Sequence, residues 1–172
     1  MEDLSLHVLD IAENAVAAGA KKVDIRVSED EANDLLRIEI ADDGKGMNPE
    51  ALKKATDPFF TTTEGKKVGL GLSLLAQATR ECDGQLEIES KPRGTRGTVV
   101  KATFRRSHID RKPVGDMAQT LATLVAGHPD VRFTYVHRKG EMEYSLDTDD
   151  PPASELRRAG TEDNGFSDAH KT

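Results

Sequence analysis

The chain has 172 residues and a formal net charge of −7, with 24 Lys and Arg against 31 Asp and Glu. This length fits one modest domain with extensions, and the acidic balance argues against nucleic acid as the main partner. The acidic start is unlike a secretory signal peptide, no apolar run approaches the ~20 residues that span a bilayer, and the single cysteine excludes an internal disulfide, so we expect a cytoplasmic protein without membrane insertion.

Two kinds of hydrophobic periodicity organise residues 1–106. Apolar residues recur every three or four positions in two segments that we predict as helices, at 4–18 and 69–81. In the second helix we expect four side chains to face inward, those of Leu70, Leu74, Leu75 and Ala78. Apolar and polar residues alternate in segments that we predict as strands, at 23–27, 36–40, 86–88 and 99–104. This mixed order predicts an α/β (α+β) two-layer sandwich with one helical face.

The remainder of the chain divides after position 146. Residues 107–146 contain a helical pattern at 115–126 and strand patterns at 131–137 and 141–146, which predict a C-terminal α-β-β extension of a domain formed by residues 1–106. This extension either continues the sheet or replaces a leading strand, and an interaction surface is the alternative to these two roles. Residues 147–172 carry four of the seven net negative charges and only two large apolar side chains, so we expect a flexible acidic tail.

The first predicted helix carries a polar face that suits a nucleotide. Asp10 and Asn14 are four residues apart and share one face of the helix, which His7 joins. An amide oxygen suits a hard cation such as Mg²⁺ held together with phosphates, and an acid four residues away can orient or deprotonate a water molecule. The alternative is an ordinary solvated helix face.

Two glycine motifs follow, each next to a predicted element. Asp42-x-Gly44-x-Gly46 comes at the end of a strand, where glycines let the backbone approach a flat ligand and the acid can accept a hydrogen bond from an exocyclic amine. Gly69-Leu-Gly71 opens a helix, whose free N–H groups can bind phosphate. Neither motif is a P-loop or a dinucleotide fingerprint. The alternatives are a tight turn and a glycine helix cap.

Five motifs follow one another along residues 4–106. They are the Asn14 helix, the Asp42 motif, Pro58-Phe59-Phe60-Thr61-Thr62, the Gly69 motif and Gly97-Thr98. In this order the chain resembles the GHKL superfamily, which includes gyrase, the ninety-kilodalton heat-shock chaperone, histidine kinases and MutL. The resemblance implies the Bergerat ATP-binding fold with a mixed sheet, in which ATP lies between the helical layer and a mobile lid.

The resemblance also assigns residues to the adenine end of the ligand. It implies that Asp42 binds adenine and that Gly44 and Gly46 lie beside the base. Thr98 matches the threonine that supports adenine. Phe60, with its neighbour in the Phe-Phe pair, matches the motif that anchors the start of the lid.

At the phosphate end, the resemblance implies that Asn14 coordinates the Mg²⁺ ion that bridges the phosphates of ATP. Gly69 and Gly71 match the second glycine box, near the phosphates and the hinge of the lid. Lys66 and Lys67 fall in the lid, where basic residues reach the terminal phosphates. The alternative for each lysine is a solvated loop position.

The acid four residues before Asn14 bears on the activity. The ATPases of the family usually carry Glu there and its histidine kinases Asn, whereas this chain carries Asp10, with Glu13 as a second candidate acid. Asp10 can act as a general base, but it is one methylene shorter than Glu, so we expect slow turnover. Three functions stay open: a Mg²⁺-dependent ATP-binding module that hydrolyses ATP slowly and regulates an unidentified protein partner, a kinase that phosphorylates His, Ser or Thr of a partner in trans, and an ATP sensor without catalysis.

Overall fold

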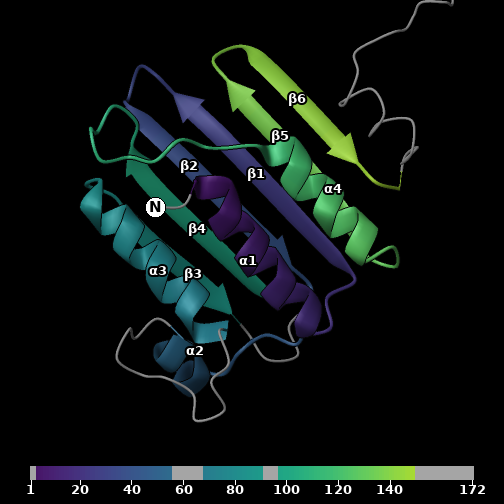
Figure 1. Cartoon of the computed structure of the whole chain (residues 1–172). Coiled ribbons are helices and arrows are strands. Elements are labelled where there is room, and N and C mark those ends of the chain that lie inside the picture. The colour runs from purple at the N-terminus through teal and green to yellow at the C-terminus, as the bar shows by residue number, and fades with distance from the viewer. Residues whose placement is uncertain (1–2, 56–67, 91–96, 150–172) are drawn as a thin grey trace, which may run out of the picture.

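The computed structural model describes residues 3–55, 68–90 and 97–149, whose strands form one mixed six-stranded sheet (Figure 1). The strands are β1 (Lys22–Asp30), β2 (Leu35–Asp42), β3 (Gln85–Ser90), β4 (Thr98–Arg105), β5 (Arg132–Lys139) and β6 (Met142–Asp147). Their order in the sheet is β3-β4-β2-β1-β5-β6. Neighbouring strands run antiparallel, except β1 and β5, which run parallel.

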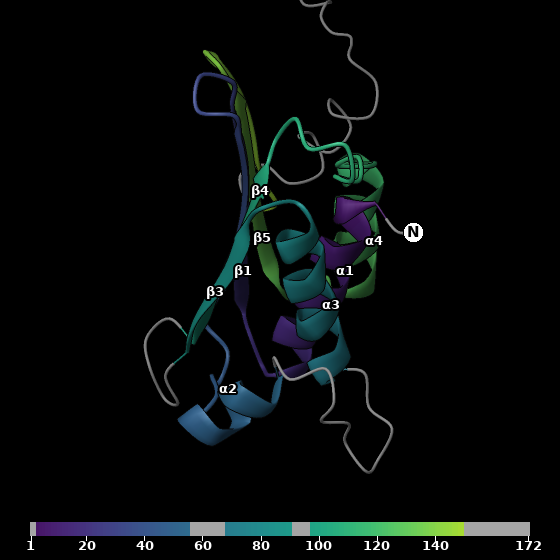
Figure 2. The ribbon, with the colours of Figure 1, turned by 90° about the vertical axis from the view of Figure 1, so that its left-hand side faces the viewer.

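The helices form a second layer on one face of this sheet. Figure 2 shows α1 (Leu4–Ala17), α3 (Val68–Glu81) and α4 (Met117–Gly127) side by side on that face, with the short α2 (Pro49–Ala55) near one end of the sheet. Among the described residues, no helix covers the opposite face, which we call the open face. The arrangement confirms the predicted two-layer α/β sandwich with one helical face and a mixed sheet.

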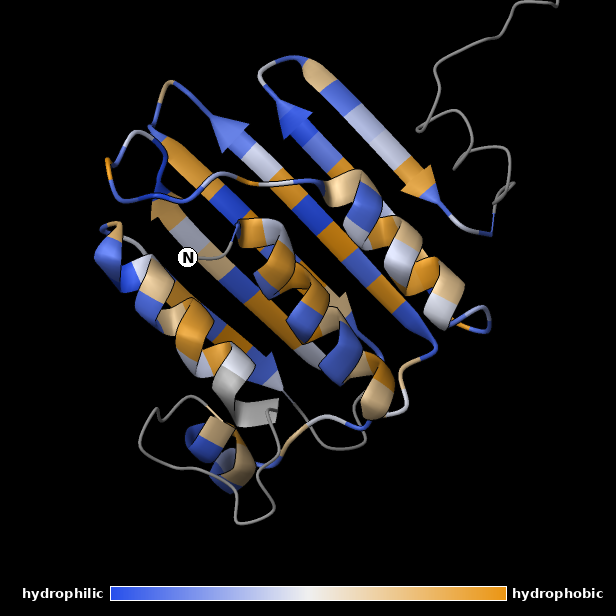
Figure 3. Ribbon diagram, in the orientation of Figure 1, coloured by the Kyte–Doolittle hydropathy of each residue, from blue (hydrophilic) through white to orange (hydrophobic). Residues whose placement is uncertain are grey.

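Strand alternation builds the core between the two layers. Every second residue of β1 and β2 faces the helices, and Figure 3 shows this alternation of hydropathy along the strands. The helix-facing side chains are at most 3% exposed: Val23, Ile25, Val27, Leu36, Ile38 and Ile40. Apolar residues of α1 close the core from the other side at helical spacing: Leu4, Val8, Ile11 and Ala15.

The C-terminal strands belong to the same sheet. β5 pairs in parallel with β1, and β6 pairs antiparallel with β5, so these strands continue the sheet beyond β1. Phe133 and Tyr135 of β5 face the helical layer and are 1% and 4% exposed. Leu121 and Leu124 of α4 lie in the same core cluster, which ties this segment to α1 and β1. Of the two roles considered for the extension, continuing the sheet is the observed one.

The predicted inward face of α3 is wrong at one position. Leu74 is 40% exposed, whereas Leu72 and Leu75 are 6% and 2% exposed. Apolar residues occupy nearly every position of this part of α3, so their spacing alone admits two different inward faces. The contact of α3 with the sheet selects the face that contains Leu72 and Leu75.

The described ranges contain no helix that is both long enough and apolar enough to cross a membrane. The acidic tail expected at 147–172 lies outside the described residues from position 150 onward.

A glycine between α3 and β3 provides a test of this packing. A Cβ atom on Gly84 would lie 1.7 Å from the carbonyl oxygen of Thr103 in β4. We expect Gly84→Ala to lower the free energy of unfolding by about 3 kcal/mol, because the two backbones must move apart. Urea denaturation followed by circular dichroism measures this loss. Gly127→Ala is the control, since its Cβ would meet nothing within 4 Å, and an equal loss in both variants would contradict this account of the packing.

Candidate functional site

The candidate site lies at one end of the sheet, on the helical side, where four parts of the chain meet. They are α1, the end of β2, the start of β4 and the first turns of α3. Strand pairing sets Asp42, the last residue of β2, opposite Thr98, the first residue of β4. Most of the residues that the sequence motifs single out are therefore brought together here.

Asp10 and Asn14 face the start of α3, as their spacing on α1 predicts. A Cβ atom on Gly71 would lie 3.3 Å from Oδ2 of Asp10 and 3.7 Å from Nδ2 of Asn14. The missing side chain at Gly71 thus lets α3 approach the polar face of α1 closely. Asp10 is exposed and Asn14 half-buried, so both groups lie at the surface of this junction.

Asp42 lies on the helical side of the sheet because it follows the same alternation as the buried residues of β2. The backbone N–H of Gly44 donates a hydrogen bond of 2.7 Å to Oδ1 of Asp42. Burial raises the pKa of the Asp42 carboxyl and the neighbouring Asp43 adds to the rise, while the N–H groups of Gly44 and Thr98 oppose it. The result is a half-buried carboxylate held by backbone donors.

Backbone segments pack closely around Asp42. Gly97 has a φ of +83°, and a Cβ atom there would lie 2.7 Å from both N and O of Gly44 and 2.8 Å from O of Asp42. On the other side, a Cβ atom on Gly44 would lie 3.1 Å from the carbonyl oxygen of Ala18, to which the N–H of Lys45 donates a hydrogen bond of 3.1 Å. The turn after β2 is thus held between the end of α1 and the start of β4, and both glycines are needed for that approach.

Gly46 and Thr98 complete this end of the site. Gly46 has a φ of +74°, which favours glycine. The hydroxyl of Thr98 lies 2.7 Å from the hydroxyl of Ser90, the last residue of β3. Ser90 also accepts a hydrogen bond of 2.7 Å from the N–H of Met47 and donates one of 3.2 Å to the carbonyl of Gly97.

Sequence reasoning missed Ser90. The signal that finds it is the register of β3 with β4, which sets Ser90 opposite Thr98. Its hydroxyl joins the turn after β2 to the start of β4, so it positions Thr98 and the backbone of Gly97. We regard Ser90 as a positioning residue of the site.

Glu13, the second candidate acid, contacts a residue outside the candidate site. Its Oε1 lies 2.8 Å from Nε2 of His128, which follows the end of α4. This contact joins α1 to α4, on the side of α1 away from α3. The geometry therefore favours Asp10 over Glu13 as the acid that accompanies Asn14.

Three of the predicted site residues, Phe60, Lys66 and Lys67, lie outside the described residues. Gly69 lies in the first turn of α3, two residues before Gly71.

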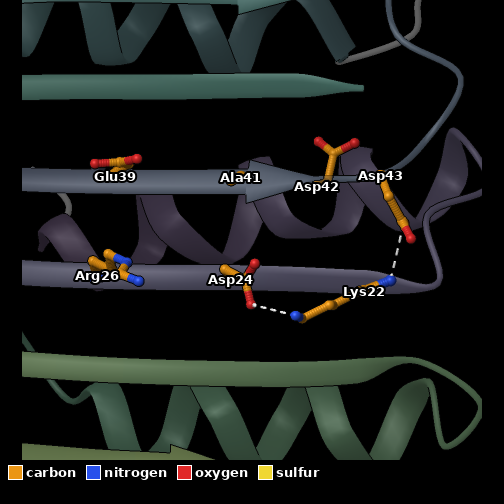
Figure 4. A pocket seen from close by; sticks show the side chains of 7 residues that line it. All are labelled: Lys22, Asp24, Arg26, Glu39, Ala41, Asp42 and Asp43. Atoms are coloured by element: carbon orange, nitrogen blue, oxygen red, sulfur yellow. Dashed lines mark hydrogen bonds and ion pairs between the residues drawn. The ribbon is translucent and has the colours of Figure 1, made fainter. Parts of the chain in front are cut away.

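A hollow of about 490 Å³ lies on the open face of the sheet (Figure 4). Its walls carry charges of both signs, and Lys22 Nζ lies 3.9 Å from Oδ1 of Asp24. The carboxylate of Asp43 accepts a hydrogen bond of 3.0 Å from the N–H of Lys22. Asp42, at the end of β2, also borders this hollow, but Asp10, Asn14 and Gly71 do not. We place the candidate site on the helical side, where these three residues lie together.

The residues of the candidate site fit a magnesium nucleotide. Carboxylate and amide oxygens at Asp10 and Asn14 are ligands that a hard cation prefers. The half-buried carboxylate of Asp42 can accept a hydrogen bond from an amino group. Between these two ends, the glycines at positions 44, 71 and 97 let neighbouring parts of the chain approach more closely than a Cβ atom would allow. The donor set thus has a cation end and a base end at one junction.

Comparison with known proteins agrees with this geometry. A family model described as histidine kinase-, DNA gyrase B- and HSP90-like ATPase matches residues 2–108. Among solved structures, the ADP-complexed MutL ATPase domain of Aquifex aeolicus superposes with a TM-score of 0.56 at 16% identity, over 92% of this chain and 70% of that one. At this identity the match shows the fold alone.

Curated relatives include two named regulatory proteins. The sensor protein kinase FleS of Pseudomonas aeruginosa is 39% identical over 95 residues, which are 54% of this chain and 23% of FleS. The nitrogen regulation protein NtrY of Azorhizobium caulinodans is 33% identical over 99 residues, 58% of this chain and 12% of NtrY. The chain thus spans less than a quarter of the length of these relatives.

The raised pKa of Asp42 predicts how the stability of the free protein depends on pH. The unfolded chain ionises Asp42 near pH 3.8 and the folded chain at a higher pH, so the group costs stability as pH rises through that interval. Asp42→Asn keeps an oxygen for the N–H of Gly44 but cannot ionise. We expect it to melt at a higher temperature than the parent at pH 7, with the difference vanishing as pH falls below 3.8.

The control for this comparison is Glu39→Gln, which removes a carboxylate from the open face of the same strand. Thermal melts of both variants across pH 3 to 8 separate the local effect from a change in net charge. A stabilisation of Asp42→Asn that persists unchanged at the acid end would contradict the assigned cause.

Proposed function

The chain belongs to the family of histidine kinase-, DNA gyrase B- and HSP90-like ATPases, and on that premise we propose that it is a Mg²⁺-dependent ATP-binding module. In this proposal it hydrolyses ATP slowly and couples nucleotide binding to the regulation of a protein partner in the cytoplasm. The observation that carries the proposal is the meeting of Asp10, Asn14 and Asp42 around the glycine backbone at one end of the sheet. Residues 1–106 would form this module, and 107–146 its extension.

Asp42 would bind the adenine base of ATP. A carboxylate beside a tight backbone turn can accept a hydrogen bond from the exocyclic amine of adenine. Gly44 carries no side chain, so the backbone of the turn beside Asp42 can lie close to a flat ring. Thr98, held by Ser90, would support the base from β4. Gly46 and Phe60 would act beside the base and at the start of the lid.

Asn14 would hold the metal ion by its amide oxygen. When bound, Mg²⁺ neutralises charge on the phosphates. The backbone of Gly69, in the first turn of α3, would supply an N–H group that has no partner within the helix. Gly71 would keep the next turn of α3 without a side chain beside Asn14. Lys66 and Lys67 would add positive charge near the terminal phosphate.

Asp10 would act on the attacking water. It lies on the same face of α1 as Asn14, next to Gly71, so its carboxylate would be close to a metal ion held by Asn14. Accepting a proton from this water is the role of a general base. Because Asp reaches one methylene less far than Glu, we propose that hydrolysis is slow.

Phosphotransfer to a protein in trans is the second candidate function. It is supported by the match to proteins named as sensor kinases, such as FleS. The same residues would bind ATP, and the acceptor would be a His, Ser or Thr of the partner instead of water. An ATP sensor without catalysis is the outcome if neither reaction occurs.

Nucleotide binding tests the metal end of the site. We expect Asn14→Ala to weaken ATP binding at least tenfold in the presence of Mg²⁺, because it removes the amide ligand. The difference between the variant and the parent should shrink when EDTA replaces Mg²⁺. Isothermal titration of the full chain with ATP measures both conditions. An Asn14→Ala variant that binds Mg²⁺-ATP like the parent would contradict the proposed site.

Phosphate release tests the role of Asp10. We expect Asp10→Asn to abolish release while ATP binding persists, because the amide cannot accept the proton. Glu13→Gln is the matched control, since its partner is His128 and its release rate should stay close to that of the parent. If the parent releases no phosphate, hydrolysis is excluded, and transfer of labelled γ-phosphate to a co-purified protein would favour the second candidate.

A further inference from the structure

β6 forms the edge of the sheet opposite to β3, and no strand of the described residues lies on the outer side of β6. Figure 1 shows β6 at the border of the sheet, with α4 on its inner side. The register of β5 with β6 is unbroken from Thr134 opposite Asp147 to Lys139 opposite Met142. Edge strands are usually blunted by Lys, Pro or a bulge, and β6 has none of these. It is therefore a flat strand edge that can accept another strand.

The hydrogen-bonding pattern shows which backbone groups point outward. The N–H of Thr148 donates to the carbonyl of Phe133 in β5, with a distance of 3.0 Å. In an antiparallel ladder every second residue bonds the same neighbour, so Leu146, Tyr144 and Met142 also direct their N–H and C=O groups toward β5. The N–H and C=O groups of Glu143 and Ser145, between them, point away from the sheet.

The side chains of β6 add an apolar contribution to this edge. Met142, Tyr144 and Leu146 share the helical side of the sheet, because they pair with Lys139, His137 and Tyr135 of β5. Met142 is 76% exposed and Tyr144 is 41% exposed, and the ring of Tyr144 lies against that of Tyr135 with 6.2 Å between ring centroids. The partner of this edge therefore offers both backbone groups and apolar side chains.

We propose that β6 pairs antiparallel with β6 of a second copy of the chain, joining two sheets into one across a two-fold axis. Two symmetric registers pair five residues of β6 while matching the outward groups of Glu143 and Ser145. The register centred on Ser145 sets Glu143 opposite Asp147 within the paired strands, and these carboxylates are ion-paired with Arg138 and Arg132 in their own copy. The register centred on Tyr144 sets Glu143 opposite Ser145 and sets Asp147 opposite only Glu141, which lies outside β6, so we place the axis at Tyr144.

The Tyr144-centred register also sets apolar side chains of the two copies opposite each other. It sets Met142 opposite Leu146 of the second copy, and the two Tyr144 residues opposite each other. Their pair is of the non-hydrogen-bonded kind, in which side chains approach more closely. Glu143 and Ser145 of the two copies then exchange backbone hydrogen bonds. The self-complementary partner for this edge is thus the strand itself.

Sedimentation equilibrium of the full chain tests the dimer. We expect a concentration-dependent dimer that Ser145→Pro weakens at least tenfold, because proline removes an outward N–H and leaves the N–H groups directed at β5 in place. Ser145→Thr keeps the N–H and should dimerise like the parent. A parent chain that stays monomeric overturns the proposal. If the parent chain is monomeric and Ser145→Pro lowers its melting temperature, another segment of the same chain pairs with this edge instead.

Disulfide crosslinking tests the register. In the proposed pair, the Cα atoms of the two cysteines of Tyr144→Cys are about 4.5 Å apart, which is within the Cα–Cα range that a disulfide bridges. Ser145→Cys is the matched control, because the Cα atoms of its two cysteines would be more than about 7 Å apart, too far for a disulfide. Cys82 is 2% exposed and does not compete. We expect oxidised dimer from Tyr144→Cys alone, and the reverse pattern would overturn the proposed register.

Discussion

The register of β2 between β1 and β4 positions both the core and the candidate site. In this register Ile40 pairs with Ile25 on one side and Val100 on the other, and all three are buried. Asp42 is two residues further along β2, so the same alternation that buries Ile40 turns the carboxylate toward the helices. A slip of one residue would turn Asp42 to the open face and expose the apolar residues of β2. The free energy of core burial thus also holds the carboxylate in place.

Close backbone approach is the second requirement of the site. Gly71 lets α3 approach Asp10 and Asn14, and Gly97 lets β4 begin against the turn after β2. A Cβ atom on Gly71 would lie next to the carboxylate of Asp10, and one on Gly97 would overlap the backbone of Gly44. Both glycines therefore have packing roles at the junction. Ser90 reinforces the second approach by contacting Gly97, Thr98 and Met47 together.

Local patterns in the sequence predict most of the helices and strands and the places of Asp10, Asn14 and Asp42 on them. The four-residue spacing of Asp10 and Asn14 fixes a shared helix face, and the position of Asp42 after an alternating segment fixes a strand end. Leu74 was predicted inward because apolar residues crowd that part of α3, and only its packing against the sheet resolves the face. Ser90 depends on the pairing of β3 with β4, and the contact of Glu13 with His128 joins residues 115 positions apart. Such contacts are set by the tertiary fold and leave no local pattern.

The environment of Asp42 connects stability to ligand binding. The groups that shift its pKa are burial, one neighbouring acid and two backbone N–H donors, and they include no cation. The folded chain therefore keeps a carboxylate partly desolvated without a compensating positive charge, which costs stability in the free protein. A ligand that donates a hydrogen bond to this carboxylate recovers part of that cost. A base with an amino group at this position is then favoured, because a base without one would cover the carboxylate further without adding a hydrogen bond to it.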